Sequence, residues 1–205
     1  MDRENRRPLA VRRLALMQSI AAALARRGVT PNALSRASTG WAALGCGAFV
    51  GTPFLGPITG SLALMLAALA IQARLLCNLF DGMVAVEGGR ATPSGAFWNE
   101  APDRVSDALL FWGAGLAAGR PALGLGVAVL ALCTAWVREF GRAEGLTPDF
   151  GGPMAKQHRM AALTLGALVA AWAGVWVLVP VLALIAAGTA LTVVLRARRV
   201  LGALG

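Results

Sequence analysis

The sequence carries three aspartates in or beside long apolar stretches, at Asp81, Asp103 and Asp107. A carboxylate inside a membrane helix costs roughly 2.5–3.5 kcal/mol, so such a residue usually has a partner and a function. Asn99, Asp103 and Asp107 are spaced i, i+4 and i+8, which places them on one face of a helix. This spacing predicts a polar stripe at the start of an otherwise apolar helix.

A second polar stripe precedes the first one along the chain. Arg74, Asn78, Asp81 and Ala85 follow at i, i+4, i+7 and i+11, again on one helical face. Two such stripes on neighbouring helices would converge just inside one membrane boundary. Taken alone, Asp81 or Asp107 also fits a helix-end residue that reaches the interface, but two coordinated stripes favour a site.

The stripes offer oxygen ligands without an adjacent histidine or cysteine, and such ligands suit a hard cation such as Mg²⁺. This ion typically takes one or two carboxylates and completes its shell with water and substrate phosphate. Basic residues further along the chain could bind that phosphate, because guanidinium groups pair well with phosphate oxygens. They are Arg138, Arg142, Lys156 and Arg159. Each also fits the ordinary excess of basic residues at cytoplasmic helix ends, and Glu139 and Glu144 could neutralise them.

The composition indicates which elements must position these residues. The chain is 57% hydrophobic and only 14% charged, with a net charge of +9, whereas charged residues make up about a quarter of a soluble domain. It therefore predicts an integral membrane protein. Basic and aromatic residues do not interleave as in proteins that stack bases, so no nucleic-acid partner is expected. Cys46, Cys77 and Cys133 lie in separate apolar runs and are interpreted as small buried hydrophobic residues.

Long uncharged runs define the membrane spans. Residues 37–73 and 160–195 carry no charge, and each run is nearly twice the ~20 residues that one span needs. A Pro/Gly turn at 51–57 and a break near Pro180 divide these runs into hairpins, and Arg120 marks the turn of a third hairpin. The predicted fold class is therefore all-α: a polytopic membrane protein with six transmembrane helices and an N-terminal interfacial amphipathic helix. The predicted spans are 32–52, 57–81, 99–119, 121–143, 156–177 and 180–197.

The basic residues predict the orientation in the membrane. With six spans, the two termini and the loops at 82–98 and 144–155 share one side. Every Lys and Arg except Arg120 lies on that side or in the adjoining helix ends. The positive-inside rule makes that side cytoplasmic, so we expect a multi-pass protein of the cell (inner) membrane with both termini in the cytoplasm.

The segment before the first span is predicted to differ from the rest. Residues 1–29 fit a cytoplasmic N-terminus with an amphipathic helix on the lipid surface, where anionic head groups attract arginine. Gly28 suits the end of that helix, and Thr30 and Pro31 suit the N-cap and first turn of the next. Residues 30–200 would then form one six-helix transmembrane domain.

One stretch resembles a known family. The residues N-L-F-D-G-M-V-A-V, followed after eight residues by G-A-F-W-N-E-A-P-D, are similar in spacing to the D-x-x-D-G-x-x-A-R…G-x-x-x-D-x-x-x-D signature of the CDP-alcohol phosphatidyltransferases. The segments TPNAL, VREFGR and GGPMAKQHR also resemble that family, so the likeness covers nearly the whole chain. The matched motif positions are Asn78, Asp81, Gly82, Ala85, Val86, Gly95, Asn99 and Asp103.

The resemblance implies transfer of a phosphatidyl group from a CDP-linked lipid such as CDP-diacylglycerol to the hydroxyl of a small alcohol, with release of CMP, in phospholipid biosynthesis. It implies that Asp103 is the general base and that a homodimer works in the lipid bilayer. The implied ligands of Mg²⁺ or Mn²⁺ are Asn78, Asp81, Asn99 and Asp103. The implied CDP-lipid contacts are Gly82, Ala85 and Gly95. The implied contacts to an acceptor phosphate are Arg138, Arg142, Lys156 and Arg159.

The sequence departs from the family signature at three positions. Asn78 and Asn99 stand where the family has aspartate, and Val86 stands where it has arginine. Asparagine keeps an oxygen acceptor but loses the charge. We therefore expect one tightly held metal ion, or two with help from Glu100 or Asp107. The substitutions resemble a bacterial branch of the family with asparagine at the same two positions.

Two other functions stay open at this point. The missing pair of aspartates leaves a catalytically impaired CDP-lipid-binding relative with a regulatory role as an alternative. An ion-coupled transporter is a second alternative, although its binding site would typically lie near the bilayer midplane, whereas the acidic residues here gather at one membrane edge. The identity of the acceptor alcohol does not follow from the sequence.

Overall fold

The computed structural model describes residues 14–86 and 94–205, apart from the side chains of Ala96 and Asn99. The described residues form helices and no strands. The long helices are α1 (Ala15–Arg26), α2 (Pro31–Gly51), α3 (Pro57–Val86), α4 (Gly95–Ala117), α5 (Pro121–Ala143), α6 (Lys156–Ala173) and α7 (Leu178–Leu204). Two short 3-10 helices are η3 (Thr52–Phe54) and η4 (Val175–Val177).

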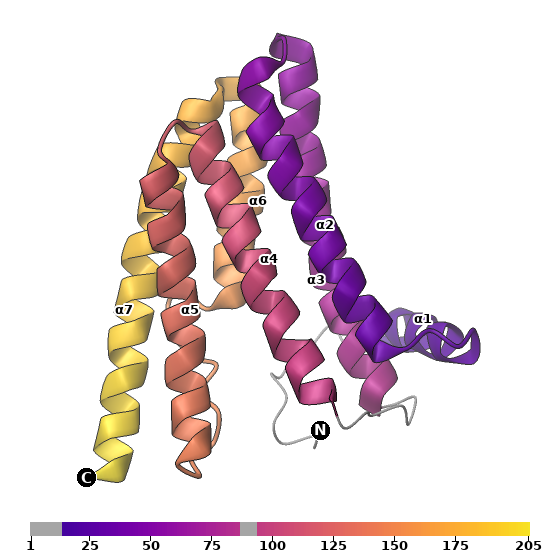
Figure 1. Ribbon diagram of the computed structural model, residues 1–205, viewed down its shortest axis with the longest axis vertical. Helices are drawn as coiled ribbons and strands as arrows, with labels where there is room; N and C mark the ends of the chain where they lie inside the picture. The colour runs from indigo at the N-terminus through magenta and orange to yellow at the C-terminus, as the bar shows by residue number, and fades with distance from the viewer. Residues whose placement is uncertain (1–13, 87–93) are drawn as a thin grey trace.

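Six of these helices form three hairpins whose turns lie at the same end of the molecule, the upper end in Figure 1. The hairpins pair α2 with α3, α4 with α5, and α6 with α7. Contacts also join α2 to α4, α3 to α6 and α5 to α7, so the six helices close into a ring around one hydrophobic core. The C-terminus lies at the lower end, and α1 projects from the bundle there (Figure 1).

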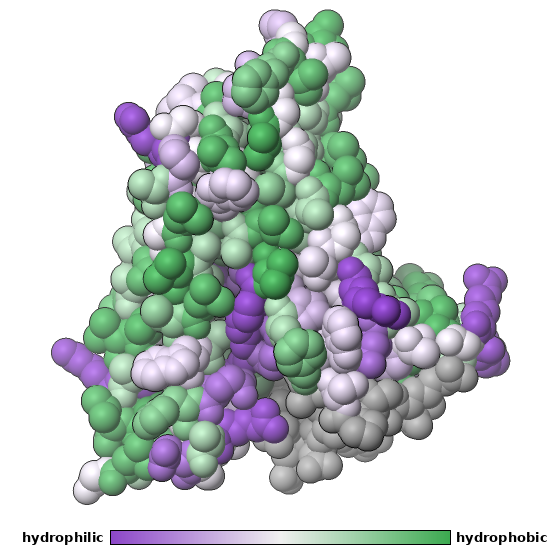
Figure 2. Space-filling view, in the orientation of Figure 1, coloured by the Kyte–Doolittle hydropathy of each residue, from purple (hydrophilic) through white to green (hydrophobic). Residues whose placement is uncertain are grey.

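Three helices in the described part of the chain are long and apolar enough to cross a membrane: Pro57–Val86, Pro121–Ala143 and Val175–Leu204, with mean hydropathies of 1.8, 1.6 and 2.5. The hydrophilic residues on the face shown in Figure 2 gather over the lower half, and hydrophobic residues dominate above them. This apolar surface is typical of a multi-pass membrane protein.

Most of the predicted helix starts and turns are confirmed. The Thr30 side chain accepts a hydrogen bond from the Ala33 backbone N–H at 3.2 Å, and Pro31 opens α2. Gly28, with a φ of 79°, follows the end of α1. The break predicted near Pro180 lies earlier, since α6 ends at Ala173 and Gly174 turns the chain with a φ of 98°. Only a residue without a Cβ takes that conformation readily, so the glycine and not the proline sets this turn.

The predicted start of the third long helix near Asn99 is wrong by one turn, because α4 begins at Gly95. Pro102 therefore lies inside the helix, where it cannot donate the backbone hydrogen bond to Trp98. Cross-helix contacts connect this first part of α4 to its neighbours: the Arg36 guanidinium of α2 lies 5.8 Å from the centre of the Trp98 ring, and Glu100 pairs with Arg138 of α5 at 2.7 Å.

Small residues let the hairpins close tightly at the upper end. A Cβ added at Gly124 of α5 would lie 2.4 Å from the carbonyl oxygen of Phe111 and 3.0 Å from the Cα of Gly115, both on α4. Cys46 of α2 is buried and its Sγ would lie 3.0 Å from a Cβ at Gly113, so it packs as the small hydrophobic residue that was expected. Close packing at this end fixes the angle at which the helices separate toward the lower end.

The short helix α1 packs against the lower part of α3. Ala21 of α1 is buried together with Leu79 and Met83 of α3, with Met17 and Phe80 at the edge of this cluster. The helix therefore contacts the same turns of α3 that carry the polar stripe.

Candidate active site

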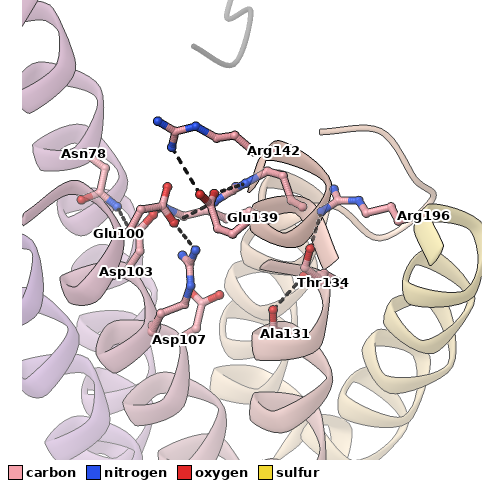
Figure 3. A network of polar contacts seen from close by, with 12 residues as sticks. Asn78, Glu100, Asp103, Asp107, Ala131, Thr134, Glu139, Arg142 and Arg196 are labelled. Carbon is pink, nitrogen blue, oxygen red and sulfur yellow. Dashed lines mark hydrogen bonds and ion pairs between the residues drawn. The ribbon is translucent and has the colours of Figure 1, made fainter. Parts of the chain in front are cut away.

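The polar stripes of α3 and α4 meet at Asp103. The side-chain amide of Asn78 donates to Oδ1 of Asp103 at 2.5 Å, and Nη2 of Arg74 donates to the same oxygen at 3.1 Å. The ammonium of Lys156, at the start of α6, pairs with Oδ2. Figure 3 shows Asn78 pointing from its own helix toward Asp103. The structure thus brings together residues that lie 25 and 53 positions apart in the sequence.

A second carboxylate lies one turn deeper on α4. Asp107 pairs with Arg74 at 2.7 Å and with Arg159 of α6 at 3.5 Å. Arg74 has 0% of its surface exposed, so both of its ion pairs are shielded from solvent. A buried charge without a partner costs several kcal/mol, and the two aspartates supply the partners that Arg74 needs.

Asp81 has a different environment from the other two aspartates. It is 4% exposed, and the Ser35 hydroxyl of α2 donates to its Oδ2 at 2.8 Å. Its Oδ1 is buried and accepts no hydrogen bond in the described part of the structure. Asp81 and Asp103 are close enough to repel each other electrostatically, and Lys156 attracts Asp81. The sequence interpretation missed Ser35, whose only signal was its place one turn after the α2 cap.

The other motif residues line the same end of the bundle. Gly82 is buried on α3, and Ala85 lies in the last turn of that helix. Gly95 opens α4. Asn99 lies on α4 as well, but its side chain belongs to the part that the structure does not describe.

The predicted acceptor-binding cations fall into two groups. Arg138 pairs with Glu100 and Glu139 at 2.7 and 2.8 Å, and Arg142 pairs with Glu139 at 3.3 Å (Figure 3). Glu100 also pairs with Arg104, so this possible auxiliary metal ligand is engaged by two arginines. Lys156 and Arg159 instead belong to the aspartate network.

A cavity of about 250 Å³ lies between α5, α7 and the loop that joins α5 to α6. Its charged lining residues are Arg138, Asp149, Arg196 and Arg199, so cations outnumber carboxylates in the wall. Arg199 donates to Asp149 at 2.8 Å. Partial burial raises the pKa of Asp149, but the hydrogen bonds from the Arg199 side chain and the Gly151 backbone N–H outweigh it and bring the pKa below its ordinary value.

Arg196 and Arg159 both donate hydrogen bonds to Thr134 of α5. Arg196 donates from Nη1 to the backbone oxygen of Thr134 at 2.9 Å, and Arg159 donates to the Thr134 hydroxyl at 3.3 Å. Arg196 also donates to the Gly151 carbonyl at 2.9 Å. Both arginines are buried, so they hold α5, α6 and α7 together beside the cavity. Sequence reasoning did not single out Arg196.

The site has few donors for a metal ion. The described residues contain no group of three or more His, Cys, Asp or Glu side chains that could hold one, because the motif has amides at Asn78 and Asn99. The unpartnered Oδ1 of Asp81 and the nearby side chain of Asn78 nevertheless suit a hard divalent cation, which takes one or two carboxylates and completes its shell with water and ligand oxygens. The residues present therefore fit one such ion.

The arrangement as a whole is a helical bundle of three hairpins with a buried network of aspartates and cations at one end. No family model matches the chain, and no curated protein matches it.

Solved structures with this fold exist. Three crystal structures of phosphatidylinositol phosphate synthase (PgsA1) from Mycobacterium tuberculosis are similar to this chain. The structure with manganese and citrate has a TM-score of 0.75 at 23% identity, covering 90% of this chain and 88% of that one. The structure with CDP-DAG bound has a TM-score of 0.74 at 24% identity, covering 91% and 94%. The apo structure has a TM-score of 0.73 at 24% identity, covering 89% and 95%. The chain therefore has the fold of that synthase over nearly its full length.

Proposed function

We propose that this chain is a CDP-alcohol phosphatidyltransferase, which transfers a phosphatidyl group from a CDP-linked lipid to the hydroxyl of a small alcohol and releases CMP. The observation that carries the proposal is the meeting of Asn78, Asp81 and Asp103 at one end of a bundle that has the synthase fold. One solved synthase of this fold has CDP-DAG bound and another has manganese. A transporter fits less well, since transporter sites lie near the bilayer midplane.

Six membrane spans belong to this proposal. The helices α2, α4 and α6 each run antiparallel to one of the three strongly apolar helices and are joined to it by a short turn. If α3, α5 and α7 cross the bilayer, their hairpin partners cross with them. The basic loops and the site then lie at the cytoplasmic face of the cell (inner) membrane, with both termini on that side.

We also propose that the chain consists of an N-terminal segment and one catalytic domain, and that it forms a homodimer. Residues 1–29 would form a cytoplasmic segment whose helix α1 lies on the lipid surface, since Leu14 and Leu16 are exposed. Residues 30–200 would form the catalytic domain. A homodimer would bury part of the apolar surface that the single chain exposes.

We propose that one Mg²⁺ or Mn²⁺ ion is held by Asp81 and Asn78, with Asn99 as a further ligand, whereas the fourth motif position, Asp103, keeps its protein partners. Such an ion would neutralise the charge of the donor diphosphate. Gly82, Ala85 and Gly95 carry little or no side chain, which lets the nucleotide approach the helices closely.

Asp103 is proposed to orient the acceptor hydroxyl and to take its proton. Its carboxylate is fixed by donors from α3 and α6, and a fixed carboxylate beside the diphosphate suits a general base. The acceptor's own phosphate or carboxylate would bind toward Arg138 and Arg142, since Lys156 and Arg159 already pair with Asp103 and Asp107. Arg138 and Arg199 line the cavity, which provides room for a small anion.

The test is CMP release by the purified protein in detergent with CDP-diacylglycerol, Mn²⁺ and a panel of alcohols with and without a phosphate. The wild type should release CMP with at least one acceptor, and Asp103→Asn should lower the rate by about a hundredfold or more, as expected for loss of a general base. Arg120→Met, at the opposite end of the bundle, is the control and should keep the wild-type rate. CMP release that is unchanged in Asp103→Asn would remove Asp103 from the role of base, and a wild type that binds CDP-diacylglycerol without turnover would favour the regulatory alternative.

A further inference from the structure

Lys156 differs from every other basic residue in the chain. The sequence has 19 Lys and Arg residues, and Lys156 is the only lysine among them. It is also the cation that pairs with Oδ2 of Asp103, in the centre of the motif site. Arginine carries a broad planar fork, whereas lysine carries a compact point charge. The compact cation therefore neutralises Asp103 from the protein itself.

The contacts of Asp103 leave little room for a metal ion on that side of the site. Oδ1 accepts hydrogen bonds from Asn78 and Arg74, and Oδ2 pairs with Lys156. Asp81 differs from Asp103, because its Oδ1 is buried and accepts no hydrogen bond in the described part of the structure. The two carboxylates of the motif are thus unequal: one has its charge neutralised by the protein, and the other has a free oxygen.

The charges of the buried network also balance. Asp103 and Asp107 form ion pairs with three cations, Arg74, Lys156 and Arg159, and Asp81 adds a third carboxylate within electrostatic reach of Lys156. A divalent ion that entered this neutral network alone would add two uncompensated charges in a partly buried place, which is costly. A diphosphate that entered with the ion would bring the opposite charge and remove most of that cost.

We infer that Lys156 is a built-in counter-cation that replaces a metal ion at Asp103, so that the site binds one divalent ion, beside Asp81, and binds it tightly only together with a diphosphate ligand. The inference rests on the proposed function for the identity of that diphosphate. Coupling of this kind is reciprocal, so the metal ion must tighten the diphosphate by the same factor.

The experiment measures Mn²⁺ binding to the full chain in detergent by the loss of the free-Mn²⁺ electron paramagnetic resonance signal, with and without CDP as the diphosphate probe. For the wild type we expect one Mn²⁺ per chain and an affinity that CDP tightens by about tenfold or more, within the usual range of coupled sites. Lys156→Met removes the counter-cation, so its affinity for Mn²⁺ without CDP should rise by about tenfold and CDP should add little. Lys156→Arg keeps the charge and should retain the dependence on CDP.

A second variant tests the same charge balance without removing the lysine. Asn78→Asp adds a carboxylate next to Asp103, so it should also raise the affinity for Mn²⁺ without CDP. Arg120→Met removes a cation from the far end of the bundle and is the matched control, with binding equal to that of the wild type. Circular dichroism and size-exclusion chromatography establish that each variant is folded.

The outcomes separate the inference from the proposed function. Tight binding of Mn²⁺ to the wild type without CDP, unchanged in both Lys156→Met and Asn78→Asp, would overturn the role of Lys156. Two Mn²⁺ ions per wild-type chain would overturn it as well. If CDP has no effect on any variant, the proposed nucleotide donor is wrong, and the comparison of wild type, Lys156→Met and Asn78→Asp without CDP still decides whether Lys156 replaces a metal ion.

Discussion

The two ends of the bundle are held together by opposite means. At the upper end, α4 and α5 touch backbone to backbone through Gly115 and Gly124, with no charged side chain between them. At the lower end, α3, α4 and α6 are joined by ion pairs of Arg74, Asp103 and Asp107. Glycine packing gives one fixed geometry, whereas an ion-pair network can exchange a protein partner for a ligand.

This difference indicates how the fold combines a fixed geometry at one end with exchangeable partners at the other. The close-packed end sets the angles of the helices, and the helices open toward the end where polar groups need room. The proposed binding of a diphosphate and a metal ion at this end would gain from partners that can be displaced. Variants at the two ends should therefore lose stability for different physical reasons.

The largest effect is expected for Arg74→Met. The change leaves Asp107 and one oxygen of Asp103 without their buried partner, and removing one member of a buried ion pair costs about 3–5 kcal/mol. The free energy of unfolding in detergent, from thermal or denaturant melts, measures this loss. Arg120→Met is the control for removal of an arginine, and equal stability of the two variants would show that the buried network contributes little.

Ser35→Ala tests the polar end at a single hydrogen bond. Asp81 would lose its donor at Oδ2, and a hydrogen bond to a charged group contributes about 1.5–3 kcal/mol. The matched control is Ser38→Ala, because Ser38 is also buried but donates only to the backbone oxygen of Ser35. Unfolding measurements should place Ser35→Ala well below Ser38→Ala in stability. If the two variants are equally stable, the Ser35 hydroxyl does not hold Asp81.

The motif itself was predictable from the sequence, because helical spacing is local. The i, i+4 and i+7 positions of Arg74, Asn78 and Asp81 put them on one face without knowledge of the fold. Turns that depend on backbone chemistry were predictable too, as at Thr30 and Pro31. Proline near position 180 was a poorer guide than Gly174, since a proline in the first turn of a helix is tolerated.

The pairing of charges was not predictable, because it depends on how the helices are arranged in the ring. Lys156 and Arg138 have similar places at helix ends, and both were expected to bind an acceptor phosphate. The structure separates them: Lys156 faces Asp103, whereas Arg138 faces Glu100 and lies 5.1 Å from the centre of the Phe150 ring. The neighbours of α6 decide this difference, and the sequence of α6 alone carries no sign of it.

The packed end can be tested with two glycines of the same helix. Gly124→Ala would place a Cβ 2.4 Å from the Phe111 carbonyl oxygen, so α4 and α5 must move apart, at a cost of about 1–3 kcal/mol. Gly126→Ala is the control, since a Cβ there meets nothing within 4 Å and should stabilise the helix by about 0.5–1 kcal/mol. Changes in the free energy of unfolding that have opposite signs in the two variants would confirm the contrast. An unchanged stability of Gly124→Ala would show that α4 and α5 move apart at little cost.

The smallest effect is expected at the surface of the cavity, for Asp149→Asn. Its partner Arg199 is exposed, and ion pairs of this kind contribute about 0.2–1 kcal/mol. The pKa of Asp149 lies below its ordinary value in the folded protein, so its contribution to stability is fully present above the unfolded pKa of about 3.9 and is lost as the pH falls through the lower, folded pKa. Wild type should therefore unfold at a slightly higher temperature than Asp149→Asn at pH 6, and the two should converge once the pH has fallen below the folded pKa. A difference in unfolding temperature that persists unchanged at low pH would show that the charge of the Asp149 carboxylate is not its source. The loop at 144–155 would then be held mainly by Arg196, which donates to the Gly151 carbonyl whatever the charge of Asp149.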